Sequence, residues 1–324
     1  MRSAERMRSG AAKRTRGARA FVRAGLPALT LAAALAHGEE ASAYCRTSVC
    51  GEPNQEYTGA LCDPPLPDDC GTALMWPTPC MTFSVQADAS AQVSYEDTVA
   101  TFEAAFATWM NADCGEGTHP RIVVTNAGPV SCTEHEFNQA EGKGNANAVF
   151  FRDEEWPHEG ASHTLALTTV TYSLESGFIY DADMEINSAE HPFTLGDDDV
   201  MFDLLSVVTH EVGHFLGMSH SESDPEATMA ARYTQGSTAL RDLTEDDVEG
   251  ICAAYPPGEI GVCDPTPRNG FSPLCEDEQT AAEEDSGCHV GSTGSGAGGR
   301  GLGGGVLAVL GLLAVAQRRR SGRR

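Results

Sequence analysis

The sequence predicts an α+β fold, and three observations lead to this prediction. Between residues 81 and 186, short stretches rich in β-branched and aromatic residues are separated by turn residues, which is typical of strands. Apolar residues recur at helical spacing after Ser94 and again around His210, which predicts two helices. Acidic residues after Thr244 mark the start of a third helix, which Pro256 and Pro257 end.

The strands are expected in five places along the chain. They are Met81–Val85, Ile122–Thr125, Ala148–Phe151, Leu165–Tyr172 and Ile179–Ile186. The first helix begins after Ser94, a suitable N-cap with Asp97 three residues further on. We interpret its apolar stripe as core packing and not as a ligand-binding cluster. The stripe consists of Val99, Phe102, Phe106, Trp109 and Met110.

Residues 210–220 read His-Glu-x-x-His-x-x-Gly-x-x-His. His210 and His214 are four apart, so on a helix both side chains lie on one face and reach one metal ion. Gly217 permits a sharp turn out of the helix, which returns His220 as a third ligand. Three neutral imidazoles leave a fourth zinc position open, as in catalytic sites. Glu211 lies beside this face, where it can hold the attacking water without being a ligand.

The alternative is that these histidines are ordinary core or surface residues that align by chance. A bare His-Glu-x-x-His is expected in about one chain in a hundred, and the added Gly and His lower that frequency about a thousandfold. The flanks also support a buried helix, with Asp199 and Asp203 near its start. Its apolar residues are Leu205, Val208, Val212, Phe215 and Leu216. We therefore predict a zinc site.

This motif resembles the signature of the metzincin metallopeptidases. The continuation Asp224-Pro225-Glu226-Ala227-Thr228-Met229 is similar to that of the matrixins, the matrix-metalloproteinase-like branch, with one extra residue before Asp224. The resemblance implies that Met229 is the Met-turn, a hydrophobic floor beneath the zinc and not a ligand. Two further segments resemble the matrixin strand before the active-site helix and the start of the matrixin C-terminal helix. They are Ile179–Asn187 and Leu243–Ile251.

The resemblance implies a metzincin (zincin-like) catalytic domain, in which a twisted mixed sheet packs on two long helices and a small C-terminal subdomain follows Gly217. It also implies that Leu165–Tyr172 is the edge strand that pairs with substrate backbone. The expected activity is that of a zinc-dependent endopeptidase acting on protein or peptide substrates, with Glu211 as general base. The alternative is a catalytically silent surface module for binding or adhesion. An intact Glu211 favours the enzyme, because a silent module does not need the base.

Calcium is a second candidate cofactor. Asp181, Asp183 and the run Asp197–Asp199 offer carboxylate oxygens, which are the ligands calcium prefers. Solvated carboxylates and helix-start acids explain these residues equally well. Matrixins also carry a structural zinc, but the spacing of the other histidines does not match it, so we do not assign that site. These histidines are His158, His163 and His191.

The first 43 residues have the layout of a signal peptide. Basic residues between 2 and 23 precede the apolar run Leu26–Ala36, and Ala41-Ser42-Ala43 forms a cleavage site. A disordered basic arm would not account for the cleavage site, and the apolar run is too short to span a bilayer. We expect cleavage after Ala43 and a protein that is secreted or held on the outer cell surface.

The charge of the exported body excludes two classes of partner. The whole chain carries a formal net charge of −26, but residues 44–288 hold 44 acidic and seven basic residues and therefore carry −37. Such a body repels nucleic acid and anionic lipid, so no nucleic-acid partner is expected. The charge suits calcium binding and solubility and favours basic peptides as substrates.

Eleven cysteines in an exported chain predict disulfides. We expect Cys114 to bond Cys132, because one follows the first helix and the other follows the next strand. Cys50-Gly51-Glu52-Pro53-Asn54 resembles the matrixin cysteine switch, but Asn replaces Asp and the preceding Pro-Arg is missing. An ordinary disulfide at Cys50 is therefore favoured. The odd cysteine is assigned to the C-terminus.

The C-terminus combines Cys288, an apolar run from Leu302 to Ala316 and the cluster Arg318–Arg320. This layout resembles the myxobacterial sorting signal known as MYXO-CTERM. The resemblance implies a membrane-held segment whose arginines stay cytoplasmic, and a processing enzyme that acts at Cys288. A plain C-terminal membrane anchor is the alternative.

These features divide the chain into five parts. They are a signal peptide (1–43), an irregular Cys-rich N-terminal segment (44–75), a matrixin-like catalytic domain (76–256), an acidic and Gly/Ser-rich linker (257–300) and a C-terminal apolar segment with an arginine cluster (301–324).

Overall fold

The computed structural model describes residues 44–50, 57–140, 143–222 and 224–275, together with the backbone of 305–307 and 314–315. The predicted signal peptide, the Gly51–Asn54 part of the switch-like motif and Cys288 lie outside the described residues. Within the described part, no helix combines the length and the apolar character that crossing a bilayer requires.

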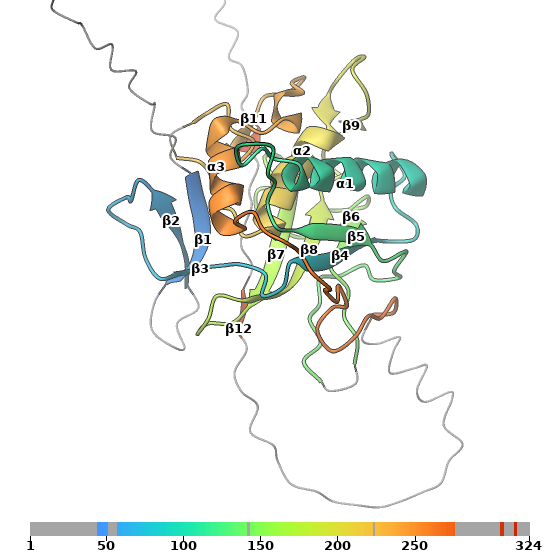
Figure 1. Ribbon diagram of the computed structural model, residues 1–324. Helices are drawn as coiled ribbons and strands as arrows, with labels where there is room; N and C mark the ends of the chain where they lie inside the picture. Colours follow the sequence, from blue (N-terminus) through green and yellow to red (C-terminus); the bar gives the residue numbers. More distant parts are fainter. Residues whose placement is uncertain are drawn as a thin grey trace, which may run out of the picture. The chain divides into compact units, whose positions relative to one another are not determined.

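A mixed sheet forms the centre of the fold and confirms the α+β prediction (Figure 1). Its strand order is β12-β7-β8-β6-β4-β5. The neighbours from β5 to β8 run parallel, whereas β7 and β12 run antiparallel to their neighbours. The strands are β4 (Cys80–Val85), β5 (Val123–Asn126), β6 (Ala148–Phe151), β7 (Ala166–Tyr172), β8 (Ile179–Ile186) and β12 (Gly305–Leu307). The first five lie within one residue of the predicted bounds.

Two helices cover one face of this sheet, α1 (Tyr95–Met110) and α2 (Leu204–Phe215) (Figure 1). Ser94 caps α1, because its Oγ accepts a hydrogen bond from the Asp97 amide at 3.1 Å. The Phe106 ring lies 5.0 Å from Phe83 of β4 and 5.1 Å from Phe215 of α2, centroid to centroid. This aromatic contact joins the sheet and both helices, so the apolar stripe of α1 is core, as predicted.

The opposite face of the sheet is covered by loops and by the tail after α3. Asp183 of β8 accepts backbone hydrogen bonds from Ala148 at 2.6 Å and from Glu136 at 2.9 Å. Asn145 exchanges backbone hydrogen bonds with Gly270 and Ser272 of the tail, at 2.8 and 3.1 Å. The described part of the expected linker, residues 257–275, is therefore anchored to the sheet.

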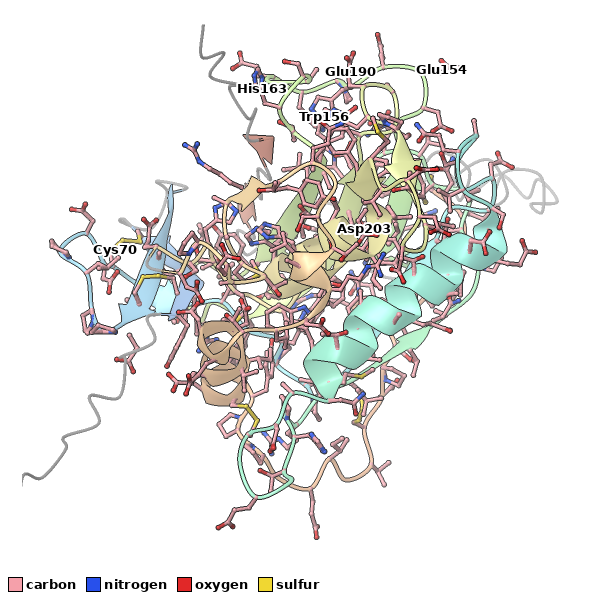
Figure 2. The ribbon with its side chains drawn as sticks, turned by 90° about the horizontal axis from the view of Figure 1, so that it is seen from above. Cys70, Glu154, Trp156, His163, Glu190 and Asp203 are labelled. Atoms are coloured by element: carbon pink, nitrogen blue, oxygen red, sulfur yellow. A yellow bond between two sulfur atoms is a disulfide. The ribbon has the colours of Figure 1, made fainter. Side chains whose placement is uncertain are left out.

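The segment 44–75 was expected to be irregular, and this prediction is wrong. It forms a small antiparallel sheet in the order β2-β1-β3. Its strands are β1 (Tyr44–Cys50), β2 (Tyr57–Asp63) and β3 (Thr72–Ala73). Disulfides Cys45–Cys62 and Cys50–Cys70 hold it, and Figure 2 shows the one at Cys70. Covalent links stabilise these strands in place of an alternating apolar face, so the sequence lacks the period-two pattern. The ordinary disulfide at Cys50 is confirmed.

Short elements surround α2 and lead to the last helix, α3 (Glu245–Ala254), which Thr244 and Asp247 start with a capping box. Two-stranded pairs form between β9 and β10 and between β11 and β13. These strands are β9 (Phe193–Thr194), β10 (Phe202–Asp203), β11 (Arg232–Tyr233) and β13 (Ala314–Val315). The single 3₁₀ turn among the described residues is η1 (Ala239–Arg241).

The predicted Cys114–Cys132 bond is wrong, because Cys114 is bonded to Cys252 of α3. The chain after α1 turns back on itself, with the Cys114 amide donating to Thr118 at 2.9 Å, and it then runs along the end of α3. The Arg121 amide donates to the Tyr255 carbonyl at 3.0 Å on that path. The bond joins residues 138 apart, which no local pattern in the sequence could indicate.

Replacing the α1 cap should weaken the fold by a predictable amount. Ser94→Ala removes the acceptor for the Asp97 amide and should lower the free energy of unfolding by about 1 kcal/mol. Ser94→Asn keeps a side-chain acceptor and should lose less. Denaturant unfolding of the two variants and the parent measures the effect, and equal stability of Ser94→Ala and the parent would contradict the cap assignment.

Candidate metal centre

Helix α2 presents His210, Glu211 and His214 from within the core. Every residue from Ser206 to Phe215 is buried, because the sheet, α1 and η1 surround the helix. Gly213 leaves room for two core side chains, since a Cβ there would meet the sulfur of Met229 and come within 2.9 Å of the Trp109 ring. The sequence predicted one apolar stripe, whereas the structure buries α2 on all sides.

The chain leaves α2 at Gly217, which adopts a positive φ of 88°. A Cβ at this residue would lie 2.6 Å from the Leu74 carbonyl oxygen, so both conformation and space demand glycine. The turn brings His220 back to the α2 histidines, with ring centroids 5.2 Å from His210 and 4.9 Å from His214. The structure thus brings together the three histidines that the sequence singled out.

Backbone carbonyls set the tautomer of both helical histidines. His210 Nδ1 lies 2.7 Å from the Thr228 oxygen, and His214 Nδ1 lies 3.0 Å from the Met218 oxygen. A carbonyl only accepts, so each Nδ1 carries the proton and each Nε2 carries a lone pair. The two Nε2 atoms are 3.2 Å apart, and neither can donate to the other. Such a pair of acceptors is repulsive unless a cation lies between them.

The geometry and electrostatics fit a zinc ion. Two nitrogens at 2.0–2.1 Å from a tetrahedral zinc are about 3.3 Å apart. One Nε2 or Nδ1 from each histidine lies within 4.8 Å of the others. Burial lowers the pKa of His214 to about 3 and of His220 to about 4, and it lowers that of His210 well below its usual value. All three imidazoles therefore stay neutral at pH 7, as metal ligands must.

Glu211 is fully buried, and its two oxygens differ. Oε2 accepts a hydrogen bond of 2.6 Å from the Thr168 hydroxyl, whereas Oε1 meets no hydrogen-bonding partner among the described residues. Burial raises the pKa of Glu211 to about 8, against the lowering effect of Thr168. A cation beside the carboxylate lowers that pKa again. Thr168 lies on β7, and the sequence offered no signal for this contact.

The carbonyl that orients His210 is itself held by α3. The Thr228 oxygen and the Met229 N–H belong to one trans peptide and point in opposite directions. Met229 N–H donates to Asp247 Oδ1 at 3.0 Å, and Thr228 N–H donates to Oδ2 at 2.7 Å. Asp247 thereby fixes the peptide that faces His210. The sequence identified Asp247 only as a helix-start acid.

The carbonyl that orients His214 is held by β1. The Thr47 hydroxyl donates to the Met218 oxygen at 3.0 Å, and the Ser219 amide donates to the Cys45 oxygen at 2.9 Å. Thr47 is buried, and its amide also donates to the Gly217 oxygen at 3.0 Å. The N-terminal sheet therefore supports the loop that leads to His220. Thr47 and Met218 are 171 residues apart, so sequence reasoning missed the contact.

Met229 is almost fully buried beneath α2 at Gly213. The carbonyl of Met229 accepts from the Ser221 amide at 2.9 Å, which holds the residue after His220. Its position suits the hydrophobic floor that the matrixin resemblance implies.

The candidate calcium ligands are placed differently from the histidines. Asp183 uses both oxygens for backbone N–H groups, and neither it nor Asp181 belongs to a converging set of three ligand atoms within the described ranges. Asp197 pairs with Arg241 at 2.7 Å. Calcium at Asp181 and Asp183 stays a prediction, and the structure adds that the carboxylate of Asp183 holds loops on the sheet.

The remaining histidines do not form a second metal site in the described part of the chain. His158 contacts Glu185, His191 contacts the Ala161 oxygen, and His163 contacts Ser162. Figure 2 shows His163 in the loops at one edge, with Trp156 and Glu190 and away from Asp203 at the start of α2.

Comparison with known proteins decides the family. A family model described as Matrixin matches residues 75–256, which is more than half of the 324 residues. The chain belongs to the matrixin family. Members of this family are zinc metalloendopeptidases.

Two curated relatives agree with the matrixin assignment. The chain is 32% identical over 142 residues to "Probable matrix metalloproteinase 095L" of Invertebrate iridescent virus 3, across 40% of this chain and 37% of the viral protein. It is 34% identical over 111 residues to "Matrix metalloproteinase-20" of Homo sapiens, across 34% of this chain and 21% of the human protein. The chain therefore spans well under half the length of these relatives.

The contact between β1 and the metal centre predicts a measurable loss of zinc affinity. Thr47→Val removes the hydroxyl that holds the Met218 oxygen and should weaken zinc binding about tenfold, as loss of an outer-sphere partner does. Thr47→Ser should restore most of the affinity. Thr72→Val, at an exposed position of the same sheet, is the matched control.

Competition with a chromophoric chelator measures zinc affinity, and thermal unfolding of the metal-free proteins reports any general loss of stability. Equal zinc affinity of Thr47→Val and Thr72→Val would contradict the positioning role.

Proposed function

We propose that this matrixin is an exported zinc-dependent endopeptidase, in which His210, His214 and His220 hold the zinc and Glu211 is the general base. One observation carries the proposal. Three neutral imidazoles converge in a buried position, beside a carboxylate that keeps one oxygen without a partner among the described residues. These are the groups that zinc-assisted hydrolysis of a peptide bond requires.

Glu211 is suited to move the proton during hydrolysis. When bound, zinc polarises the scissile carbonyl and lowers the pKa of a water to about 7. Thr168 holds Oε2 of Glu211, which leaves Oε1 to accept the proton of the attacking water. The same carboxyl group then donates the proton to the leaving amine.

An extended peptide fits the sheet edge beside Glu211. Thr168 lies near the start of β7, which pairs with β8 on one side. On the other side, within the described residues, β7 pairs with β12 at Val170–Tyr172 alone. An edge strand offers main-chain groups to an incoming peptide strand. The acidic body favours basic peptides among these substrates.

The alternative, a silent binding or adhesion module, gains no support from the site. Glu211 is present, its carboxylate is oriented by Thr168, and both helical histidines are held in the tautomer that binds metal. A module without activity has no use for the oriented carboxylate.

The proposal includes export and processing. Cleavage after Ala43 would leave β1, which begins at Tyr44, intact. Four disulfides suit folding in an oxidising compartment. We propose that the C-terminal segment is held in the membrane until a processing enzyme acts at Cys288, which leaves the body attached through Cys288 or released.

Substituting Glu211 should separate zinc binding from turnover. Glu211→Gln spares the ligands but removes the base, so zinc stoichiometry should persist while kcat falls about 10²- to 10⁴-fold. His214→Ala should lose zinc itself. Glu103→Gln, an exposed glutamate on α1, is the control and should leave both properties unchanged. Peptidase assays with metal analysis test this, and full activity of Glu211→Gln would disprove the assigned base.

The termini of the mature protein test export and processing. N-terminal sequencing should begin at Tyr44, and C-terminal peptides should end at or before Cys288. Cys288→Ala should accumulate a longer, membrane-held form, because the processing site is lost. Recovery of peptides containing Arg318–Arg320 from the mature surface protein would favour a plain anchor instead.

A further inference from the structure

Two cysteines outside the metal centre lie side by side without a disulfide. Of the ten cysteines between residues 45 and 275, eight form four disulfides. The other two, Cys132 and Cys275, place their sulfur atoms within 4.8 Å of each other and of a Glu136 carboxylate oxygen. Both lie on the sheet face opposite α1 and α2, where the tail crosses the loop after β5.

The backbone around both cysteines is already fixed. Ser131, directly before Cys132, donates from its amide to the Pro273 oxygen at 2.9 Å. Asn145 pairs with Gly270 and Ser272 through two more backbone hydrogen bonds. A covalent link between Cys132 and Cys275 therefore requires little further ordering of the chain.

We propose that Cys132 and Cys275 form a fifth disulfide, which closes the tail onto the sheet. The bond places every cysteine from 45 to 275 in a disulfide and leaves Cys288 as the odd one. The tail is then tied at both ends, by Cys80–Cys263 at its start and by the new bond at its end. The folded body extends to Cys275, beyond the matched family range.

The bond forms by thiol–disulfide exchange with an external disulfide donor, such as an oxidoreductase of the export compartment. Cys275 is half-buried and more accessible than Cys132, so its thiolate attacks the donor, forms a mixed disulfide and releases one donor thiolate. The Cys132 thiol, 3.7 Å from Glu136 Oε1, passes its proton towards that carboxylate and attacks the Cys275 sulfur. The second donor thiolate leaves. Two protein thiols are oxidised and the donor disulfide is reduced to two thiols.

The bond has a mechanical consequence that rests on the proposed processing at Cys288. A body attached through Cys288 is pulled through the tail, and force on the tail would peel it from Asn145 one hydrogen bond at a time. A disulfide at Cys275 transmits the force directly to the loop after β5. The hydrogen bonds between residues 263 and 275 are then shielded from the load.

The same three residues could instead ligate a metal ion, since two thiols and a carboxylate are ligand types of zinc. The ligand set disfavours this, because only these three ligand atoms converge here within the described residues, whereas a structural zinc site uses four. Asp183 does not belong to this set of ligand atoms, and its two oxygens each accept a backbone N–H. The experiment must therefore distinguish metal binding at these three residues from the disulfide.

The full chain, expressed with export and purified in its mature form, tests the proposal without any variant. Free thiols are blocked with N-ethylmaleimide in denaturant, and the protein is digested without reduction. We expect a linked peptide pair containing Cys132 and Cys275, about 2 Da lighter than the two thiol peptides together, that separates on reduction. Neither cysteine should carry the label.

Variants then show what the bond does. In Cys275→Ser, Cys132 should become fully labelled, and limited proteolysis should cut the 264–274 segment that resists cleavage in the parent. Cys288→Ser is the matched control and should leave the linked pair intact. Zinc content and peptidase activity of Cys275→Ser should equal those of the parent. Failure of the disulfide proposal can therefore be distinguished from failure of the proposed function.

Two results would overturn the proposal. One is complete labelling of both cysteines in the unreduced mature protein, with a second equivalent of zinc by metal analysis, which would establish a metal site. The other is a linked peptide that joins Cys132 to any cysteine other than Cys275.

Discussion

The structure depends on one electrostatic constraint, namely that His210 and His214 aim lone pairs at one buried point, to which His220 also brings a ring nitrogen. Two acceptors 3.2 Å apart repel each other, and burial removes the water that would relieve them. The arrangement persists because the Nδ1 atoms of His210 and His214 are each bonded to a backbone carbonyl, which fixes the tautomer and the ring orientation. A divalent cation between the two nitrogens would convert this repulsion into binding.

The carbonyls that orient His210 and His214 are held in place by two elements that are far apart in the sequence. The peptide that faces His210 is held by Asp247 of α3, and the peptide that faces His214 is held by Thr47 and Cys45 of β1. Only the first of these supports lies within the matched matrixin range. The N-terminal sheet therefore supports the candidate metal centre, and its Cys50 is bonded to Cys70. The N-terminal segment resembles an inhibitory propeptide motif at Cys50, but at Thr47 it supports the peptide that faces His214.

The two faces of the sheet have different chemistry for a physical reason. Helices cover one face with apolar rings, whereas loops and the tail cover the other and bring many backbone N–H groups that need acceptors. Asp183 of β8 meets this need, because it accepts from the backbone N–H groups of Glu136 and Ala148. Glu185 of β8 accepts instead from the Arg152 side chain of the loop after β6, at 2.6 Å. Hydrogen bonds from His135 and Arg152 outweigh burial and lower the pKa of Glu185 to about 2, so it stays charged. Buried acidic side chains thus join the loops to the sheet, as the Phe106 ring joins the helices to its other face.

The sequence by itself determined whatever depends on neighbours in the chain. The spacing of His210, Glu211 and His214 along α2, the turn at Gly217, the Ser94 cap and the five strands are local, because a few adjacent residues dictate each backbone conformation. Only the tertiary structure decided that Thr168 holds Glu211, that Thr47 and Asp247 hold the orienting peptides, and that Cys114 joins Cys252. These contacts join elements up to 171 residues apart, and neither a threonine nor an aspartate carries a local pattern that names its distant partner. The candidate ligands could be predicted from their spacing, whereas the residues that orient them depend on how the sheet, the helices and the N-terminal strands pack together.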